Sequence, residues 1–238
     1  MPLLKSAAIS SIAVSAALTG LTAIVPPAMA GCSDGPGAGV DWSDCRKRNL
    51  ILRGTTLTDA DLSDTDLTST DLRDAALEGA NMNKANLLKA HLGGASLAGA
   101  DLEKIVGYRA LFHDTDLTNA NFEKSEMQRA DFSGSTIVNV NFEKAELGRA
   151  VFSGAKLDNV NFDFAILARA DFRDAELSGS VNFASAYLYL SRFEGLDLSG
   201  VTGLQQSQID LSCGDAETIL PDGLTRPGSW PCNDDAVN

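Results

Sequence analysis

The chain has 238 residues, with 19 Lys and Arg against 32 Asp and Glu, which gives a formal net charge of -13. This acidic balance argues against general nucleic-acid binding, which needs a net basic surface to release counterions. A hydrophobic content of 44% is enough to bury the core of one large domain or two small ones.

The first thirty residues have the architecture of a secretory signal peptide. Lys5 is the only charged residue before Asp34, and an apolar, Ala-rich run over residues 7–25 follows it. A Pro-Pro pair ends that run, and the tripeptide Ala-Met-Ala that ends at Ala30 supplies small residues for a cleavage site. We therefore expect residues 1–30 to be a signal peptide and the mature chain to be exported, periplasmic or secreted. Cleavage deletes one Lys and no acid, so the net charge becomes -14.

Two alternatives are open at this end of the chain. The apolar run is somewhat long for a signal core, which leaves an uncleaved membrane anchor as one alternative. The stretch Met29-Ala30-Gly31-Cys32 also resembles a bacterial lipobox, in which Cys32 is acylated, although Met is a poor residue at the first position. Acylation would leave an odd number of cysteines, whereas four cysteines in an exported chain are typical of two disulfides.

A five-residue repeat follows. From Leu52 to Leu177 every fifth residue is large and apolar, and the 26 positions hold 15 Leu, 7 Phe, 2 Met, 1 Ile and the single exception Gly107. The residue two places before is Ala, Ser or Thr at 22 of the 26 positions. A period of five fits neither a helix nor a flat strand. It fits a coil that turns one corner per repeat, with the large residue at the axis and the small one at the corner.

A longer period of twenty residues sets the size of the coil. Residues 121–140 and 141–160 both begin with Asn-Phe-Glu-Lys and agree along their length, so four pentads form one coil. About thirty pentads then give about 7.5 coils, and stacked backbones about 4.8 Å apart make a rod roughly 36 Å long. Over residues 112–177 Phe alternates with Leu, Met or Ile at the central position, which predicts stacked Phe rings on two opposite walls. Such internal repeats indicate a solenoid.

These features resemble the pentapeptide-repeat family, whose motif is written A(D/N)LXX. The resemblance covers residues 50–200, and Ala60-Asp61-Leu62 is one copy of the motif. It implies an all-β fold, a right-handed quadrilateral β-helix, whose handedness the spacing does not supply. We therefore expect a pentapeptide-repeat β-solenoid over residues 50–200.

Both ends of a solenoid need caps, because they expose apolar surface and unpaired backbone. We expect residues 31–49 to form an N-terminal cap with Trp42 as its lid. Residues 201–238 are expected to form a C-terminal cap of helix and loop, in which Thr202 caps the start of a short helix and a tail with Trp230 follows.

The four cysteines lie in pairs at the two ends of the predicted rod. Three pairings are possible, but a disulfide spans at most about 7 Å between Cα atoms. The rod separates the pairs by far more than that. We therefore expect the disulfides Cys32–Cys45 and Cys213–Cys232, which act as stabilising links of the caps.

Nothing in the sequence indicates catalysis. It contains no Ser-His-Asp set, no HExxH motif and no phosphate-binding loop, and its two histidines, His91 and His113, are predicted at opposite edges of one wall. Catalytic carboxylates need a concave site that perturbs their pKa values, which a filled solenoid does not offer. We therefore expect no enzymatic activity, no cofactor and no metal site. The repeated acids and amides are expected to form a hydrogen-bonded ladder of Asp61, Asn81, Asp101, Asn121, Asn141 and Asn161.

One side of the predicted rod gathers the cations of the repeat. Every twentieth residue gives a Lys column, and the next corner gives an Arg column. We interpret the two columns as a candidate interaction stripe for an anionic partner, either an acidic protein or an envelope polymer. The alternative is that neighbouring columns of Glu, among them Glu126 and Glu146, pair with the cations and only solvate the wall. The Lys column is Lys84, Lys104, Lys124 and Lys144, and the Arg column is Lys89, Arg109, Arg129, Arg149 and Arg169.

The Arg column also passes the one break in the repeat. Because Gly107 replaces a large inward residue, we expect the coil to deform there. Tyr108 then either folds inward and refills the core or marks an apolar contact patch.

The expected function is that of a non-enzymatic, exported structural or protein-interaction scaffold of the bacterial cell envelope. No nucleic-acid partner is expected, and no stable membrane insertion after removal of the signal. The family resemblance supplies an alternative, because some cytoplasmic members are acidic dimeric rods that resemble DNA and bind a type II topoisomerase. The signal peptide and the paired cysteines argue against that alternative, since the topoisomerase is cytoplasmic.

Overall fold

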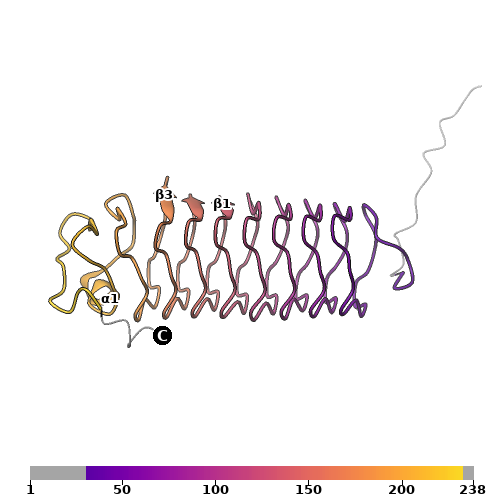
Figure 1. Cartoon of the computed structure of the whole chain (residues 1–238), viewed down its shortest axis with the longest axis horizontal. Coiled ribbons are helices and arrows are strands. Elements are labelled where there is room, and N and C mark those ends of the chain that lie inside the picture. Colours follow the sequence, from indigo (N-terminus) through magenta and orange to yellow (C-terminus); the bar gives the residue numbers. More distant parts are fainter. Residues whose placement is uncertain (1–30, 233–238) are drawn as a thin grey trace, which may run out of the picture.

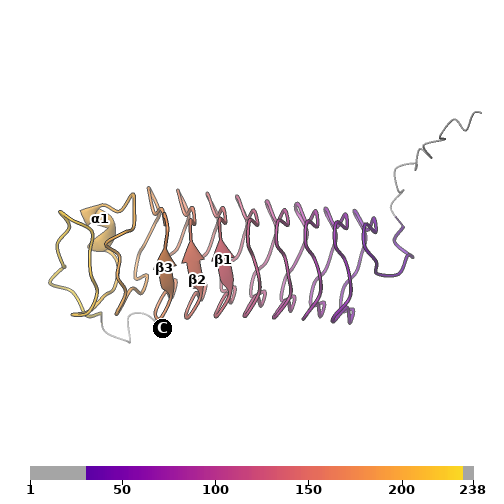
Figure 2. The same ribbon diagram turned by 90° about the horizontal axis from the view of Figure 1, so that it is seen from above.

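The computed structural model describes residues 31–232 as a straight rod of stacked coils (Figure 1). The view turned by 90° shows the same regular stacking, with the two ends of this range at opposite ends of the rod (Figure 2). The predicted signal peptide at 1–30 lies outside the described residues, as do residues 233–238. Within the described range no helix has both the length and the apolar character needed to cross a membrane.

Each coil pairs in parallel with the coil twenty residues further along. Bridges of this kind join Asp61 to Asn81 and Asn81 to Asp101. The longest paired stretches are Thr136–Val138 (β1), Lys156–Asp158 (β2) and Glu176–Ser178 (β3), which form a parallel sheet in the order β1-β2-β3. The prediction of an all-β solenoid with four pentads per coil is confirmed. The number of coils and their handedness stay predictions.

Coil pairing begins early in the described chain. Asp41 pairs with Asp61, and Arg46 pairs with Asp66, inside the segment that was expected to be a cap. Pairing starts here because Trp42 and Lys47 continue the five-residue series of inward positions toward the N-terminus.

The inserted residue near Val181 shifts the pairing by one place. Asn161 pairs with Asn182, and the twenty-residue step then resumes with Asn182 and Thr202. Gly179 has φ 58° at this point, and the amide of Ser180 donates to Asn159 Oδ1 at 2.9 Å. The extra residue is therefore absorbed at one corner, and the inward register is kept.

The corners are tight turns whose third residue has left-handed backbone geometry. In one of them the amide of Thr65 donates to the carbonyl of Leu62 at 3.2 Å, and Asp64 has φ 54°. A four-residue turn with a positive φ at its third residue, and not at its second, is a type II turn. Gly, Asn and Asp accept it readily, whereas Lys84 and Arg129 adopt it at φ 58° and 60° against their preference. The two cation columns therefore stand on corners and project from the rod.

From Phe112 onward the core consists of two columns of Phe rings between two columns of aliphatic side chains, and the coils before it are filled by Leu and Met. Phe142 stacks on Phe122 and Phe162, with ring centroids 4.9 and 5.2 Å apart. It meets Phe132 and Phe152 of the opposite wall edge to face at 5.6 and 6.0 Å. Stacking down two opposite walls is the predicted arrangement. The edge-to-face contacts across the axis add a second interaction that fixes the positions of the rings.

The break at Gly107 is filled by a neighbouring coil. A Cβ atom at Gly107 would lie 2.2 Å from Met127 Sδ, so the Met127 side chain occupies the space that a large residue would take. Tyr108 stays half-buried on the surface, so the first of its two alternatives, folding inward to refill the core, is wrong. The coil is not interrupted either, since Val106 pairs with both Asn86 and Glu126. A flexible Met reaches the gap at less cost than a backbone distortion.

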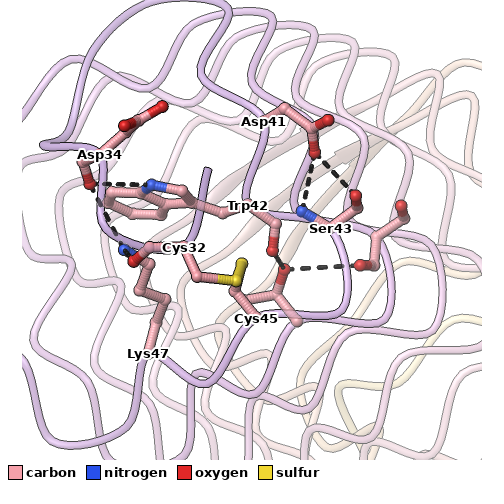
Figure 3. Close-up of a disulfide and its surroundings, with 9 residues drawn as sticks. Cys32, Asp34, Asp41, Trp42, Ser43, Cys45 and Lys47 are labelled. Atoms are coloured by element: carbon pink, nitrogen blue, oxygen red, sulfur yellow. Dashed lines mark hydrogen bonds between the residues drawn. A yellow bond between two sulfur atoms is a disulfide. The ribbon is translucent and has the colours of Figure 1, made fainter. Parts of the chain in front are cut away.

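The N-terminal end is closed by Trp42, as predicted (Figure 3). The Trp42 side chain is 1% exposed, and its indole nitrogen donates to the carbonyl of Asp34 at 3.1 Å. The Lys47 ammonium lies 3.7 Å from the ring centroid and donates to the carbonyl of Cys32 at 2.9 Å. Burial lowers the pKa of Lys47, and the charge of Asp34 partly opposes that shift. The predicted disulfide Cys32–Cys45 is confirmed, with Cα atoms 5.4 Å apart.

The C-terminal end contains the short helix Gln206–Ile209 (α1). Thr202 does not cap it, because its backbone still pairs with Asn182 as part of a coil. The N-cap residue is Gln205, whose backbone amide donates to Gln208 Oε1 at 2.8 Å. The prediction of a Thr202 cap is therefore wrong, since regular stacking extends further than the sequence pattern indicated.

A disulfide and a buried Trp complete this C-terminal cap. The predicted bond Cys213–Cys232 is confirmed, with Cα atoms 5.5 Å apart. The Trp230 side chain is 8% exposed, and its indole nitrogen donates to the carbonyl of Ser212 at 2.7 Å. The tail is thus fixed to the last coil by one covalent link and one buried side chain.

Candidate interaction surface

One outward column of the rod is the predicted ladder of Asp and Asn side chains. The Asn121 amide donates to Asp101 Oδ1 at 3.1 Å, and the Asn141 amide donates to Asn121 Oδ1 at 3.3 Å. The same Oδ1 atom of Asn121 also accepts the amide of Glu123, two residues along the chain, at 3.1 Å. The ladder is therefore confirmed between Asp61 and Asn81 and from Asp101 to Asn161, and its side chains also stabilise the turns that follow them.

The two histidines do not form a metal site with their neighbours. His113 Nδ1 lies 3.1 Å from Asp114 Oδ2, and its ring covers Gly93, where a Cβ atom would lie 2.4 Å away. Across residues 31–232 no group of three or more His, Cys, Asp or Glu side chains is arranged to hold a metal ion.

The Lys column is paired with the acidic column beside it. Lys104 Nζ and Lys124 Nζ each lie 2.5 Å from a carboxylate oxygen of the preceding Glu. Lys144 contacts Glu143 in the same way, and Lys84 lies 3.9 Å from Asp64. The hydrogen bond with Glu123 raises the pKa of Lys124. Such exposed pairs stabilise little, but they neutralise the column, as the alternative interpretation expected.

The Arg column differs from the Lys column. In the part of the chain that the structure describes, the guanidinium groups of Arg129 and Arg149 have no hydrogen-bond or ion-pair partner. Glu146, an expected partner, accepts a hydrogen bond from the Gln128 amide at 2.5 Å instead. Arg109 lies over the ring of its neighbour Tyr108, 5.2 Å from the centroid.

A shallow trough of about 460 Å³ runs beside the Arg column. Three Arg residues and one Asp line it. The carboxylate is that of Asp131, whose Oδ1 already accepts the amide of Ser133 at 2.9 Å. The trough is therefore positively charged on an acidic protein, with apolar side chains between the charges. Its lining residues are Arg109, Leu111, Arg129, Asp131, Arg149 and Val151.

An exposed apolar cluster lies at the C-terminal end of the two cation columns. Ile166 and Tyr187 pair across adjacent coils, and the rings of Tyr187 and Tyr189 are nearly parallel with centroids 6.2 Å apart. The backbone of Tyr189 accepts the amide of Arg169 at 2.8 Å, so the cluster borders the Arg column. The apolar cluster consists of Phe164, Ile166, Tyr187, Tyr189 and Leu211, with side chains between 41% and 54% exposed.

The sequence signal of this cluster is a local change in the repeat, which the predicted sites do not include. Where the preceding coil has Lys144 and Glu146, the next has Phe164 and Ile166. Outward residues on the other walls of the same coils stay polar, for example Asp171. The change to apolar residues is therefore confined to one wall, which makes it a local surface feature.

The coils, their register and their disulfide-bonded ends define a solenoid repeat protein. The family model described as "Pentapeptide repeat region" matches residues 108–181. The model described as "Pentapeptide repeats (8 copies)" matches residues 43–74, 52–83 and 70–106. The chain belongs to the pentapeptide-repeat family.

Similar solved structures are other pentapeptide-repeat proteins. HetL from the cyanobacterium Nostoc, which is involved in heterocyst differentiation regulation, is 20% identical, with a TM-score of 0.38 and coverage of 81% of this chain and 87% of HetL. QnrB1, a plasmid-mediated fluoroquinolone resistance protein, is 18% identical, with a TM-score of 0.33 and coverage of 78% and 84%. A thylakoid-lumen protein of Arabidopsis thaliana is 24% identical, with a TM-score of 0.14 and coverage of 51% and 75%. The curated proteins include no match to this sequence.

Proposed function

We propose that the protein is an exported, non-enzymatic interaction scaffold of the bacterial cell envelope, and that the Arg column is its contact surface for an anionic partner. The observation that carries this proposal is the contrast between the two cation columns. The Lys column is neutralised by its own acids, whereas Arg129 and Arg149 have no hydrogen-bond or ion-pair partner among residues 31–232 and line a trough.

The arrangement suits electrostatic recognition. The wall is rigid, because its coils pair with their neighbours and stacked rings fill the core from Phe112 onward. A positive row on a mature chain of net charge -14 orients an anionic partner toward one wall, since the rest of the surface repels it. Guanidinium groups also bind carboxylates and phosphates through two parallel hydrogen bonds, which adds geometric selectivity.

Export is supported by the signal-like segment at 1–30 and by the two disulfides, which persist in oxidising compartments. The disulfide with Cys45 uses the Cys32 sulfur that lipid attachment would require. The DNA-mimic alternative has less support, because the columns of Lys and Arg interrupt the acidic surface that such mimicry needs.

The proposal is tested with a pair of matched double variants. Arg129→Gln with Arg149→Gln removes two unpaired charges, and Lys104→Gln with Lys124→Gln removes two paired ones from the neighbouring corner. Both pairs are exposed corner residues, so we expect unfolding midpoints close to that of the wild type. We expect only the Arg variant to lose association with the envelope fraction in a pull-down, and the wild-type association to weaken as salt rises. A set of partners that neither salt nor the Arg variant changes would contradict the proposal.

A further inference from the structure

One wall of the rod is open between β3 and the coil that follows it. Elsewhere on this wall the amide of each inward residue donates to the next coil, as Leu97 does to the carbonyl of Asp116 at 2.8 Å. Between β3 and residues 197–199 the described part of the chain has no such hydrogen bond and no bridge. Figure 1 shows the coil after β3 standing further from it than the earlier coils stand from one another.

The opening lies where the repeat gains a residue. The preceding coils pair at a step of twenty residues, whereas Ser180 adds one residue at the corner after β3. The walls on both sides of the opening stay paired, through the bridges Asp171–Arg192 and Asn182–Thr202. The opening is therefore confined to one wall, and the paired walls beside it hold it in place.

Backbone hydrogen-bonding groups are left without partners on both sides of the opening. Among residues 31–232 none of these groups takes part in a hydrogen bond. Unpaired amides and carbonyls along a strand are the template on which a further strand forms. The unpaired groups are the amides of Leu177 and Gly179, the carbonyl of Ala175, the amide and carbonyl of Asp197, and the carbonyl of Ser199.

A cleft of about 260 Å³ occupies the opening, and Leu177, Val181 and Val201 supply its apolar lining. The cleft reaches the core, because Leu177 is only half-buried, whereas Leu157 at the equivalent position of β2 is fully buried. Its volume is just below the roughly 300 Å³ at which small-molecule pockets begin. The cleft therefore suits a short extended segment and excludes a folded element.

We propose that this opening is a further binding site, in which an extended peptide of a partner protein adds a strand to the edge of β3. Its amides and carbonyls repeat at the spacing of a strand, so the ligand that matches them is another peptide backbone. The site goes beyond the Arg column and does not depend on it. The trough lies on the wall of Asp131 and Val151, which pair in a ladder separate from β1, β2 and β3.

The register of the added strand follows from the rest of the wall. The bridges of the rod are parallel, and the peptide continues the sheet β1-β2-β3 in the same direction. Side chains alternate between the two faces of a strand. The peptide residue in register with Leu177 therefore points into the cleft, where Leu177 and Val201 favour a small apolar side chain such as Val.

The outward positions on either side of that residue select for charge and size. The preceding residue lies between the exposed carboxylates of Glu176 and Asp197, which favour Lys or Arg. The following residue lies between Ser178 and Ser199, which suit a small polar side chain. The site therefore prefers the order basic, apolar, small from the N-terminus of the peptide to its C-terminus.

The test follows amide hydrogen exchange of the exported protein by NMR. In the free protein the amides of Leu177 and Gly179 should exchange about tenfold faster or more than that of Leu157, which lies in the paired part of the sheet. The probe is the acetylated and amidated peptide Gly-Lys-Val-Ser-Gly at millimolar concentration. It should slow exchange at Leu177 and Gly179 by about tenfold or more and leave Leu157 unchanged.

Two altered peptides separate strand addition from other kinds of binding. A methyl group on the amide nitrogen of Lys removes the donor that pairs with the carbonyl of Ala175, so this peptide should give no protection. Replacement of Lys by Asp places a third carboxylate beside Glu176 and Asp197 and should weaken binding by about tenfold.

Protein variants test the opening itself. Deletion of Ser180 restores the twenty-residue step, so the wall should close, protect its own amides and lose peptide binding. Glu176→Gln with Asp197→Asn keeps the shapes of both side chains and should weaken binding by about threefold to tenfold. Glu126→Gln with Glu146→Gln removes the same charge from another wall and should bind the peptide as the wild type does.

Three outcomes would overturn the inference, and none of them needs the deletion variant to fold. Slow exchange of Leu177 and Gly179 in the free protein would show that the wall is closed. Absence of protection by the peptide would show that the edge accepts no strand, and equal protection by the methylated peptide would show that the backbone does not pair. Arg129→Gln with Arg149→Gln should bind the peptide as the wild type does, so failure of this site leaves the proposed function of the Arg column standing.

Discussion

A substitution at an inward position of the repeat removes far more contacts than one at an outward position. Phe142 is fully buried, stacked on two rings and in edge-to-face contact with two more. We expect Phe142→Ala to lower the free energy of unfolding by about 3–5 kcal/mol, because it deletes a ring and leaves a cavity that stacked coils cannot close. Urea denaturation followed by circular dichroism measures this loss.

The matched control for Phe142 is the corner residue Asn139. Its side chain donates to Asn119 Oδ1 at 3.1 Å, and its φ is 55°. Ala at this position would add backbone strain, so Asn139→Gly is the better control and should change the free energy of unfolding by less than about 1 kcal/mol. Equal losses at residues 139 and 142 would mean that the assignment of inward and outward positions is wrong.

A second residue-scale prediction concerns acid stability. Arg73 donates two hydrogen bonds to Asp71, at 2.8 and 2.6 Å, and thereby lowers the pKa of Asp71 from 3.8 to about 2. A carboxyl group whose pKa is lowered in the folded state stabilises that state above its unfolded pKa, and the contribution disappears as the pH falls through the folded value. The difference in free energy of unfolding between wild type and Asp71→Asn should therefore be constant above about pH 5 and shrink between pH 3.8 and about 2. A difference that stays constant down to pH 2 in urea titrations would contradict this account.

At the scale of elements, the regular coils could be predicted from the sequence and the irregular parts could not. A strict period of five fixes which residues point inward, so the Phe columns and the Asn ladder follow from spacing alone. The two disulfides follow because the rod separates the cysteine pairs. Spacing does not fix the rotamers of long side chains, however, so the pairing of Lys124 and the lack of a partner at Arg129 needed the structure. The caps are not periodic, which is why the roles of Lys47 and Gln205 were missed.

The C-terminal cap supplies an element-scale prediction. The Trp230 ring packs against Gly214 so closely that a Cβ atom there would lie 2.4 Å from the ring. Gly214→Ala should displace Trp230, break its bond to Ser212 and cost about 1–3 kcal/mol, as overpacking usually does. Faster hydrogen exchange over residues 205–232, with unchanged exchange in the central coils, is the expected result. Gly228→Ala is the control, because a Cβ atom there meets nothing within 4 Å. Equal exchange in the two variants would contradict the proposed contact.

At the scale of the whole molecule, the charge and the fold act on the partner in different ways. The net charge of -14 on the mature chain keeps anionic partners away from most of the surface. Because each coil pairs with the next at a step of twenty residues, one cation in each coil forms a straight row. A solenoid needs only a short sequence change, repeated every twenty residues, to build such a row along one wall. The same geometry places the apolar cluster in line with the Lys column and the Glu column beside it, because Phe164 and Ile166 follow Lys144 and Glu146.

The last prediction concerns the mature chain as a whole. The amide of Gly31 donates to the carbonyl of Asp41 at 2.9 Å, so the backbone joins the rod at the residue that cleavage after Ala30 would leave as the new N-terminus. With both disulfides formed, the intact mass of the exported protein should correspond to residues 31–238 less four hydrogens. Reduction and alkylation should then label four cysteines, since each disulfide releases two thiols. A diacylglycerol adduct on Cys32 would reject both the cleavage site and the pairing with Cys45, and an intact mass that includes residues 1–30 would indicate the uncleaved anchor.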